Sequence, residues 1–499
     1  MSEIENKTQE KRRLAQEEAS KKKKKSTWLK IGAVLFVLVF AALAVYESSF
    51  ITRLVPAAKV KDTTYTVAEY NWMYTSNYYQ IYNTIYQQYG NYASLVLDTK
   101  KSLEKQQYSS EQTWAEYLKE YTDKSLETLT ALHDQAEAAG FVLDDSQKEQ
   151  IQTDWDNLVS TAKSSGYTAG AYLETAYGRG VNEKVYKEMY ERYLYAYSYG
   201  DSVSEGFEIS DSEIDARYNE NKLDYDRVTY EYYFVSGSAS EGVTEEDAMK
   251  QAKEKAEAAL ASEDLAAYIK SEFDSELTES RYVSHSGANE AFADWLFEDS
   301  RAAGDKEVFE ATNGYYIVVF EAKDDLHYNM VSARHLLVRP EDSTSTDSWD
   351  AAKEKAEGYL KTYKSLGETE DNFGYLALAY SEDSGSKSNG GLYENIQKGQ
   401  MVREFEDWCF DSARKEGDVE IIKTNYGYHL MYFVGVGEDY YHYTIDSDIR
   451  SEKYTEYIEG IKEGYTLTKG SAKFMAAKHL LLTQFFGTAV HKMRCRPVF

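Results

Sequence analysis

Two histidines lie on two short segments that have the composition of β-strands. His335 lies in ARHLLV (333–338) and His429 lies in YHLMYF (428–433), both rich in aromatic and branched residues. A polar, glycine-rich loop, YSEDSGSKSNGGLYENIQKGQM (380–401), separates them in the sequence. A single histidine on a strand is most often a satisfied core residue, whereas two imidazoles beside a polar loop can form a hydrogen-bonding site. From this pattern alone, a structural pair and a functional site both remain open.

The histidine-bearing segments belong to the second copy of an internal repeat. Residues 292–320 and 405–433 align without a gap and share 11 of 29 residues. Upstream, VTYEYYFV (228–235) corresponds to VSARHLLV (331–338), and each precedes a segment containing KEKAE. Strand, helix and strand patterns in this order predict two compact α+β modules, over residues 226–325 and 329–438. The first copy has Tyr232 and Tyr316 at the histidine positions and lacks the polar loop.

The region before the repeat, residues 57–225, has the periodicity and capping signals of helices. Thr66 with Glu69, and Ser210 with Glu213, have the spacing of capping boxes. Further helices are predicted to run from Ser110 toward Gly140 and from Ser146. The chain contains 46 tyrosines, many at helical spacing in this region. They can pack helix against helix or form an adaptable aromatic surface for unfolded segments.

The N-terminal residues have the pattern of a membrane anchor. Ile31 to Tyr46 is uncharged, and adding Trp28 and Leu29 gives a segment, 28–47, long enough to span a bilayer. The five lysines at 21–25 predict a cytoplasmic lead (1–27) and a body outside the cytoplasm. The alternatives are a buried core helix and a cleavable signal, for which Ala42-Leu43-Ala44 fits the cleavage site. The expected location is the cell membrane, with a single pass.

Composition excludes several classes of function. The net charge is −29 although both ends of the chain are basic, so the acidic body between them repels nucleic acid. Two cysteines cannot form a disulfide framework or a CxxC metal site, and the eight scattered histidines do not indicate a structural zinc site. Residues 439–468 read as a helix and a short strand. The basic tail, 469–499, is expected to lack regular structure.

The second module resembles the parvulin-type peptidyl-prolyl cis–trans isomerase domain. The segments ARHLLV, NFGYLALAYSEDSGSKSNGGLY, GQMVREFEDWCF and TNYGYHLMYF occur in that family's order and spacing across essentially the whole domain. The resemblance implies a catalytic set of His335, Asp383 and His429, with Thr424 as a weaker addition that supports the histidine pair. It implies that the proline ring is held by Leu392, Met401 and Phe405.

The whole plan is similar to that of the exported PrsA/SurA-type foldases. The implied fold class is α+β, with an N-terminal transmembrane helix, a helical chaperone domain (57–225) and two parvulin-like α+β domains. The first of these (226–325) resembles a degenerate copy and the second (329–438) an intact one. The resemblance also implies that the helix in 439–468 packs back on the chaperone region, and that the partners are unfolded exported polypeptides containing X–Pro bonds.

The chemistry of such a domain requires neither a metal nor a cofactor. Rotation about an amide faces a barrier of ~18–20 kcal/mol because resonance is lost. A dry pocket that holds the ring, with polar groups matched to the twisted amide, lowers that barrier without covalent chemistry. Burial and neighbouring charges act on the pKa values of the three polar residues in opposite directions, so their protonation states stay open. The acidic loop RPEDSTSTDSWD (339–350) would repel a phosphate, which predicts no dependence on phosphorylated substrates.

Two functions therefore compete, and a third is disfavoured. The first is an anchored, extracytoplasmic prolyl isomerase, favoured by the intact set of His335, Asp383 and His429. The second is a holdase that binds unfolded chains without useful catalysis. A purely structural surface protein would not need this loop and pocket.

Overall fold

The computed structural model describes residue 36 and residues 49–239 and 242–477. The expected transmembrane segment, 28–47, and its basic lead lie almost entirely outside these residues. Within the described part of the chain, no helix has both the length and the apolar character to cross a membrane. The chain divides into two compact units, one of residues 1–207 with 451–499 and one of residues 208–450.

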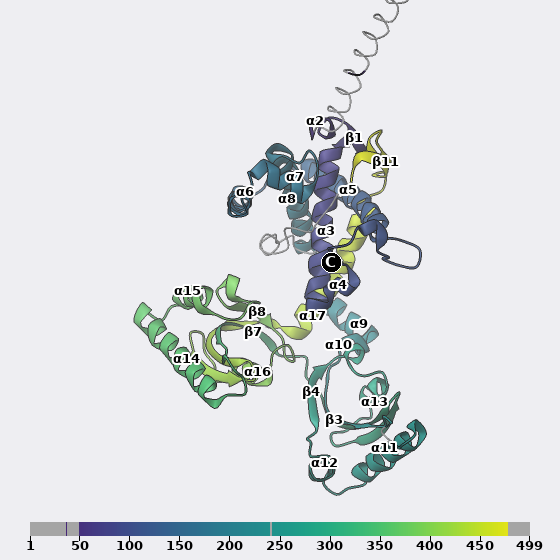
Figure 1. Ribbon diagram of the computed structural model, residues 1–499, viewed down its shortest axis with the longest axis vertical. Helices are drawn as coiled ribbons and strands as arrows, with labels where there is room; N and C mark the ends of the chain where they lie inside the picture. The colour runs from purple at the N-terminus through teal and green to yellow at the C-terminus, as the bar shows by residue number, and fades with distance from the viewer. Residues whose placement is uncertain (1–35, 37–48, 240–241, 478–499) are drawn as a thin grey trace, which may run out of the picture. The chain divides into compact units, whose positions relative to one another are not determined.

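The first unit consists mainly of helices. The helices α3 (Val67–Tyr89), α5 (Trp114–Ala139) and α8 (Glu183–Glu205) pack against one another (Figure 1). Its other helices are α2 (Ser49–Thr52), α4 (Ala93–Val96), α6 (Asp145–Ser164) and α7 (Ala169–Tyr177), with 3-10 turns η1 (Gly90–Tyr92), η2 (Leu103–Lys105) and η5 (Lys473–Met475). Large side chains fill the core, and Tyr65, Tyr70, Tyr74 and Tyr78 are fully buried. These tyrosines therefore serve packing.

Local sequence signals set where several helices of the chain begin. Thr66 forms the predicted capping box with Glu69 at the start of α3, and Ser210 forms the other with Glu213 at the start of α9 (Asp211–Glu220). The predicted start at Ser110 is wrong, because Thr113 caps α5 through a capping box of its own with Glu116. The serine lies in a turn that pairs Gln107 with Thr113.

The start of the predicted helical region and the C-terminal tail both depart from the sequence expectation. Residues 56–66 are strands, β1 (Pro56–Val60) and β2 (Thr63–Thr66), which form a sheet of order β11-β1-β2 with β11 (Leu467–Lys469). Residues 469–477, which were expected to lack regular structure, contain the end of β11 and the turn η5. Gly470 and Ala472 donate backbone hydrogen bonds to Ala57 and Pro56, so their pairing with β1 orders residues after β11. Residues 478–499 lie outside the described part.

The second unit contains the two repeated modules, each built on a four-stranded antiparallel sheet. The strand orders, β4-β3-β6-β5 and β8-β7-β10-β9, are the same when each sheet is numbered from its own first strand. The first sheet contains β3 (Val228–Ser236), β4 (Thr278–Val283), β5 (Lys306–Ala311) and β6 (Gly314–Lys323), with helices α11 (Glu245–Leu260), α12 (Leu265–Phe273) and α13 (Ala293–Leu296). The second contains β7 (Asn329–Val338), β8 (Leu392–Ile396), β9 (Val419–Thr424) and β10 (Gly427–Asp439), with α14 (Thr346–Leu366), α15 (Glu370–Tyr380), α16 (Arg403–Cys409) and the turn η4 (Lys387–Asn389).

Strand alternation gives the second sheet two different faces. Leu336 and Val338 of β7 pack with Leu430 of β10 under α14 and α15. Residues 331 and 333, on the opposite face, pack with Phe405 beneath α16. Because successive side chains point to opposite faces, His335 belongs to the face that carries α16.

Helices link the modules to the rest of the chain. The helices α9 and α10 (Lys222–Tyr225) precede the first sheet, and α17 (Tyr440–Ile461) follows the second. Within the first unit, Tyr457 of α17 donates a hydrogen bond to Tyr199 of α8. The part of α17 in the first unit therefore contacts α8.

Candidate active site

The two histidines are brought together by the pairing of β7 with β10. His335 pairs with Met431, and His429 pairs with Leu337, in the antiparallel register. The Nδ1 atoms of the two imidazoles are 2.9 Å apart and the rings are stacked, with centroids 5.2 Å apart. Both side chains are buried, at 3% and 4% exposure.

The loop between α15 and β8 brings Asp383 to the histidine pair. Its attachment to β7 needs Gly391, whose carbonyl accepts the His335 N–H at 2.8 Å and where a Cβ would lie 2.1 Å from the His335 carbonyl oxygen. Asp383 Oδ2 then lies 3.0 Å from His335 Nε2. The same oxygen accepts hydrogen bonds from the hydroxyl and backbone N–H of Ser386 and from the hydroxyl of Tyr393.

These donors stabilise the charged form of the carboxylate. The hydrogen bond from His335 holds the pKa of Asp383 well below its usual range; partial burial opposes this shift, and the Ser386 donors reinforce it. Burial and the nearby carboxylate raise the pKa of Tyr393 to about 12, so its hydroxyl keeps the proton that it donates. Asp383 is therefore an acceptor with several donors aimed at one oxygen.

Thr424, at the end of β9, completes a chain of four polar groups. Its Oγ1 lies 2.8 Å from His429 Nε2 and also accepts the Tyr426 N–H at 3.1 Å. Burial, with the neighbouring His335, lowers the pKa of His429 to about 3. His429 is therefore neutral at physiological pH.

Because His429 is neutral, one of its ring nitrogens donates a hydrogen bond and the other accepts one. Asp383 is ionised and accepts only, so His335 Nε2 carries a proton and donates. When His335 carries this proton alone, its Nδ1 accepts from the Nδ1–H of His429, and His429 Nε2 accepts from the Thr424 hydroxyl; a second proton on His335 would reverse both bonds. One proton then lies between each pair of atoms and no contact joins two donors or two acceptors. The chain runs from Thr424 through both imidazoles to the carboxylate.

An apolar basin lies beside this polar chain. The Phe405 ring stands nearly perpendicular to the His335 and His429 rings, with centroids 5.4 and 5.8 Å away. Met401 and Tyr393 pack in the same hydrophobic cluster as Phe405. The site therefore combines a dry surface for a ring-shaped group with hydrogen-bonding groups at its edge.

The structure does not place Leu392 in this cluster. Leu392 pairs with Arg334, whose guanidinium contacts Glu370 of α15 on the opposite face of the sheet. Tyr393 pairs with Ala333 and so shares the face of His335. Sequence reasoning missed Tyr393 and Ser386. The alternation of β8 could have identified Tyr393, while Ser386 needed the folded loop.

The first module has an aromatic group where the second has its polar chain. The rings of Tyr232 and Tyr316 are 6.0 Å apart, and Phe292, the counterpart of Phe405, lies 5.3 Å from Tyr316. Only residues 274–277 join α12 to β4. The two carboxylates there, Asp274 and Glu276, are exposed and pair with Lys270, so neither takes the place of Asp383. This module can offer aromatic contacts but not the hydrogen-bond chain.

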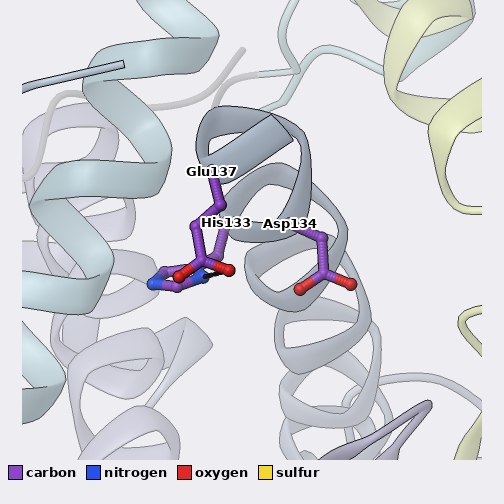
Figure 2. A group of neighbouring side chains, drawn as sticks. All are labelled: His133, Asp134 and Glu137. Carbon is purple, nitrogen blue, oxygen red and sulfur yellow. Dashed lines mark ion pairs between the residues drawn. The ribbon is translucent and has the colours of Figure 1, made fainter. Parts of the chain in front are cut away.

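A second group of polar side chains lies on α5 in the helical unit. Figure 2 shows His133 and Glu137 together, with Asp134 set to one side; their potential metal-ligand atoms lie within 4.8 Å of one another. Asp134, however, already binds the Lys61 ammonium at 3.0 Å and the Tyr465 hydroxyl at 2.9 Å. The positive charge of Lys61 on Asp134, one of the three potential ligands, would repel a metal cation bound at this group. The group fits an ion-pair network better than a metal centre.

Comparison with known proteins agrees with the geometry of the second sheet. Residues 315–435 match the model of the PPIC-type PPIase domain. The second module is therefore a parvulin-type isomerase domain, as the resemblance of its segments indicated. The match begins in β6, upstream of Asn329, at which the module was expected to start.

Two groups of curated relatives carry this domain. The chain is 32% identical to foldase protein PrsA 1 of Bacillus cereus over 122 residues, 24% of this chain and 37% of the relative. It is 32% identical to the chaperone SurA of Pseudomonas putida over 127 residues, 25% of this chain and 28% of the relative. The matches span about a third of the length of these relatives. The chain thus resembles PrsA/SurA-type foldases.

Solved structures of foldases also align with the chain. The crystal structure of foldase protein PrsA from Streptococcus pneumoniae aligns over 72% of this chain and 86% of its own, at 11% sequence identity and a TM-score of 0.23.

Proposed function

We propose that this protein is a peptidyl-prolyl cis–trans isomerase and chaperone that assists the folding of exported polypeptides. The observation that carries the proposal is the continuous hydrogen-bond chain from Thr424 to Asp383 beside the Phe405 basin. The reaction rotates an X–Pro bond without covalent chemistry, so a pocket and oriented polar groups suffice.

In the proposed mechanism the apolar basin and the polar chain have separate tasks. Phe405, Met401 and Tyr393 hold the proline ring, while the preceding carbonyl rotates at the polar edge. Preorganised hydrogen bonds contribute most when they do not reorganise during the reaction. The four donors to one oxygen of Asp383 provide such an arrangement.

Two variants test these tasks separately in a proline-limited peptide isomerisation assay. Asp383→Ala is expected to lower kcat by about 10- to 100-fold, the value of a charge-assisted hydrogen-bond set. Met401→Ala is expected to raise KM by about 3- to 30-fold with a smaller change in kcat. Asp350→Ala, at an exposed carboxylate of α14, is the matched control and should equal the parent. Equal rates for all four proteins would refute the proposal.

The acidic residues of 339–350, which form the loop before α14 and the first turn of that helix, support independence from phosphorylation. A phosphoserine–proline peptide should be turned over no faster than its serine counterpart, because Glu341, Asp342, Asp347 and Asp350 would repel the phosphate. A faster reaction of the phosphorylated peptide would contradict this part of the proposal.

A second function, holding unfolded chains, is favoured by an exposed apolar group near the end of α3. Tyr86, Tyr89 and Tyr92 are 45%, 44% and 70% exposed, and Leu95 is 82% exposed. Exposed aromatic and apolar side chains in one region are typical of an interaction surface. A Tyr92→Ser, Leu95→Ser variant should suppress aggregation of an unfolded protein less well than the parent while isomerising peptides equally. If the parent suppresses aggregation but isomerises nothing, the holdase function alone stands.

We also propose that residues 28–47 anchor the protein with its body outside the cytoplasm. The support is the uncharged segment with five lysines before it. Cell fractionation and protease digestion of intact cells test this: the body should be membrane-bound and accessible from outside. A soluble, shorter product would instead indicate that the segment is a cleaved signal.

A further inference from the structure

An edge strand of the first module contains a strained aromatic residue. Tyr282 in β4 has φ +51°, a conformation that bulky residues rarely adopt. The irregularity coincides with a register shift between β3 and β4, and the Tyr282 N–H donates to the Thr229 hydroxyl. Strain of this kind persists only where the surroundings determine it, and it is concentrated at functional positions.

The strained residue packs against the segment that leads into α16 of the second module. Gly399 has φ +81°, and a Cβ there would lie 2.8 Å from Tyr282 Cβ and 3.1 Å from the Arg281 carbonyl oxygen. Only glycine fits such a close approach in this conformation. The neighbouring Lys398 ammonium lies over the rings of Tyr282 and Tyr328, 5.3 and 4.7 Å from their centroids.

Ion pairs run in both directions across the same contact. Arg281 of β4 lies 3.2 Å from Asp407 and 3.7 Å from Glu406, and Arg403 of α16 lies 2.9 Å from Glu279 of β4. The Glu406 side chain is only 4% exposed, and its other oxygen accepts the Gly399 N–H. A carboxylate buried to this degree is costly without its partners, so Arg281 stabilises the folded form of the segment.

The segment held in this way carries two residues of the apolar basin. Met401 lies between Gly399 and Arg403, and Phe405 immediately precedes Glu406. Phe405 contacts both imidazoles edge-on, so a displacement of the start of α16 would open the basin.

We propose that the first module, which lacks the hydrogen-bond chain, positions the substrate basin of the second module through Arg281 and Tyr282 acting on residues 398–407. These are positioning residues, because the structure gives them no contact with the proposed reacting groups. The proposal rests on the isomerase function proposed above. It assigns the first module a role in substrate affinity.

Variants of the full chain test the proposal with two independent measurements. Arg281→Ala is compared with the parent, with Arg281→Lys and with Lys306→Ala, a control in β5 at the opposite edge of the same sheet. Hydrogen exchange of residues 397–409 measures the order of the segment. Peptide isomerisation, separated into kcat and KM, measures the basin.

Arg281→Ala should exchange about tenfold faster over residues 397–409 and raise KM about 3- to 10-fold, with kcat changed less than twofold. Arg281→Lys keeps the positive charge, so its exchange rate and KM should lie close to those of the parent. Lys306→Ala should match the parent. A merely structural role would lower the active fraction, and so kcat, without moving KM.

The outcomes distinguish this proposal from the isomerase function itself. If Arg281→Ala leaves the exchange of residues 397–409 unchanged, or speeds it without raising KM, the positioning role is refuted. If the parent does not isomerise the peptide, the function fails, and the Kd of a proline-containing peptide replaces KM. An Arg281→Ala variant with the parent's Kd would then refute the positioning role as well.

Discussion

The neutral state of His429 leads to a prediction about how stability depends on pH. The ordinary pKa of histidine is 6.5, and burial lowers that of His429 to about 3 in the folded protein. Between these two values the unfolded chain binds a proton at this position and the folded chain does not. The free energy of unfolding therefore rises with pH across this window, and acidification through the window removes this contribution.

The size of the effect follows from the two pKa values. Acidification from about pH 7.5 to about pH 4.5 should cost the second module between about 2 and 3 kcal/mol through His429 alone. Asp383 has its pKa lowered from 3.8, so its contribution is present above 3.8 and is lost only on further acidification. At about pH 4.5 the two effects are therefore separable.

A variant with no titratable group at position 429 isolates the contribution of His429 to the pH dependence of stability. His429→Gln keeps a donor and an acceptor but cannot bind a proton near neutral pH. Native-state hydrogen exchange of β10, corrected for the intrinsic effect of pH, gives the free energy of opening for both proteins. The parent should lose about 2–3 kcal/mol more than His429→Gln over this range. Equal losses would show that His429 is not held neutral, and would refute the proton arrangement derived from it.

Three further tests concern other contacts of the site and its counterpart in the first module. Tyr393→Phe removes one donor to Asp383 and should lower kcat/KM about 3- to 10-fold in the peptide assay; an unchanged value would show that the hydroxyl is dispensable. Thr424→Val leaves His429 Nε2 without a partner and should destabilise the second module by about 1–3 kcal/mol in hydrogen exchange, a loss that Thr424→Ser should largely avoid. Tyr232→His with Tyr316→His, placed in an Asp383→Ala chain, should restore no isomerisation because the carboxylates of the short loop 274–277 are exposed and pair with Lys270. Recovered activity would contradict that reasoning.

Much of the architecture could be predicted from the sequence because the signals are local or repeated. The capping boxes at Thr66 and Ser210 form as predicted, since each depends on residues three positions apart. The two modules share one strand order because their sequences share the residues that build the sheet. By contrast, β1 could not be distinguished from the helical region, because its pairing partners lie in β2 and, far away in the sequence, in β11.

The sequence by itself determined the residue types of the candidate site. Histidines at matching strand positions, with a carboxylate in the intervening loop, predict a polar cluster wherever the two strands pair. Tertiary structure decided which groups touch, because hydrogen-bond partners and burial depend on register and on loop closure. It placed Tyr393 rather than Leu392 on the face of the basin, since one residue of register exchanges the two faces of a strand. It also brought Tyr282 to Gly399, a contact between residues more than a hundred positions apart that no local pattern encodes.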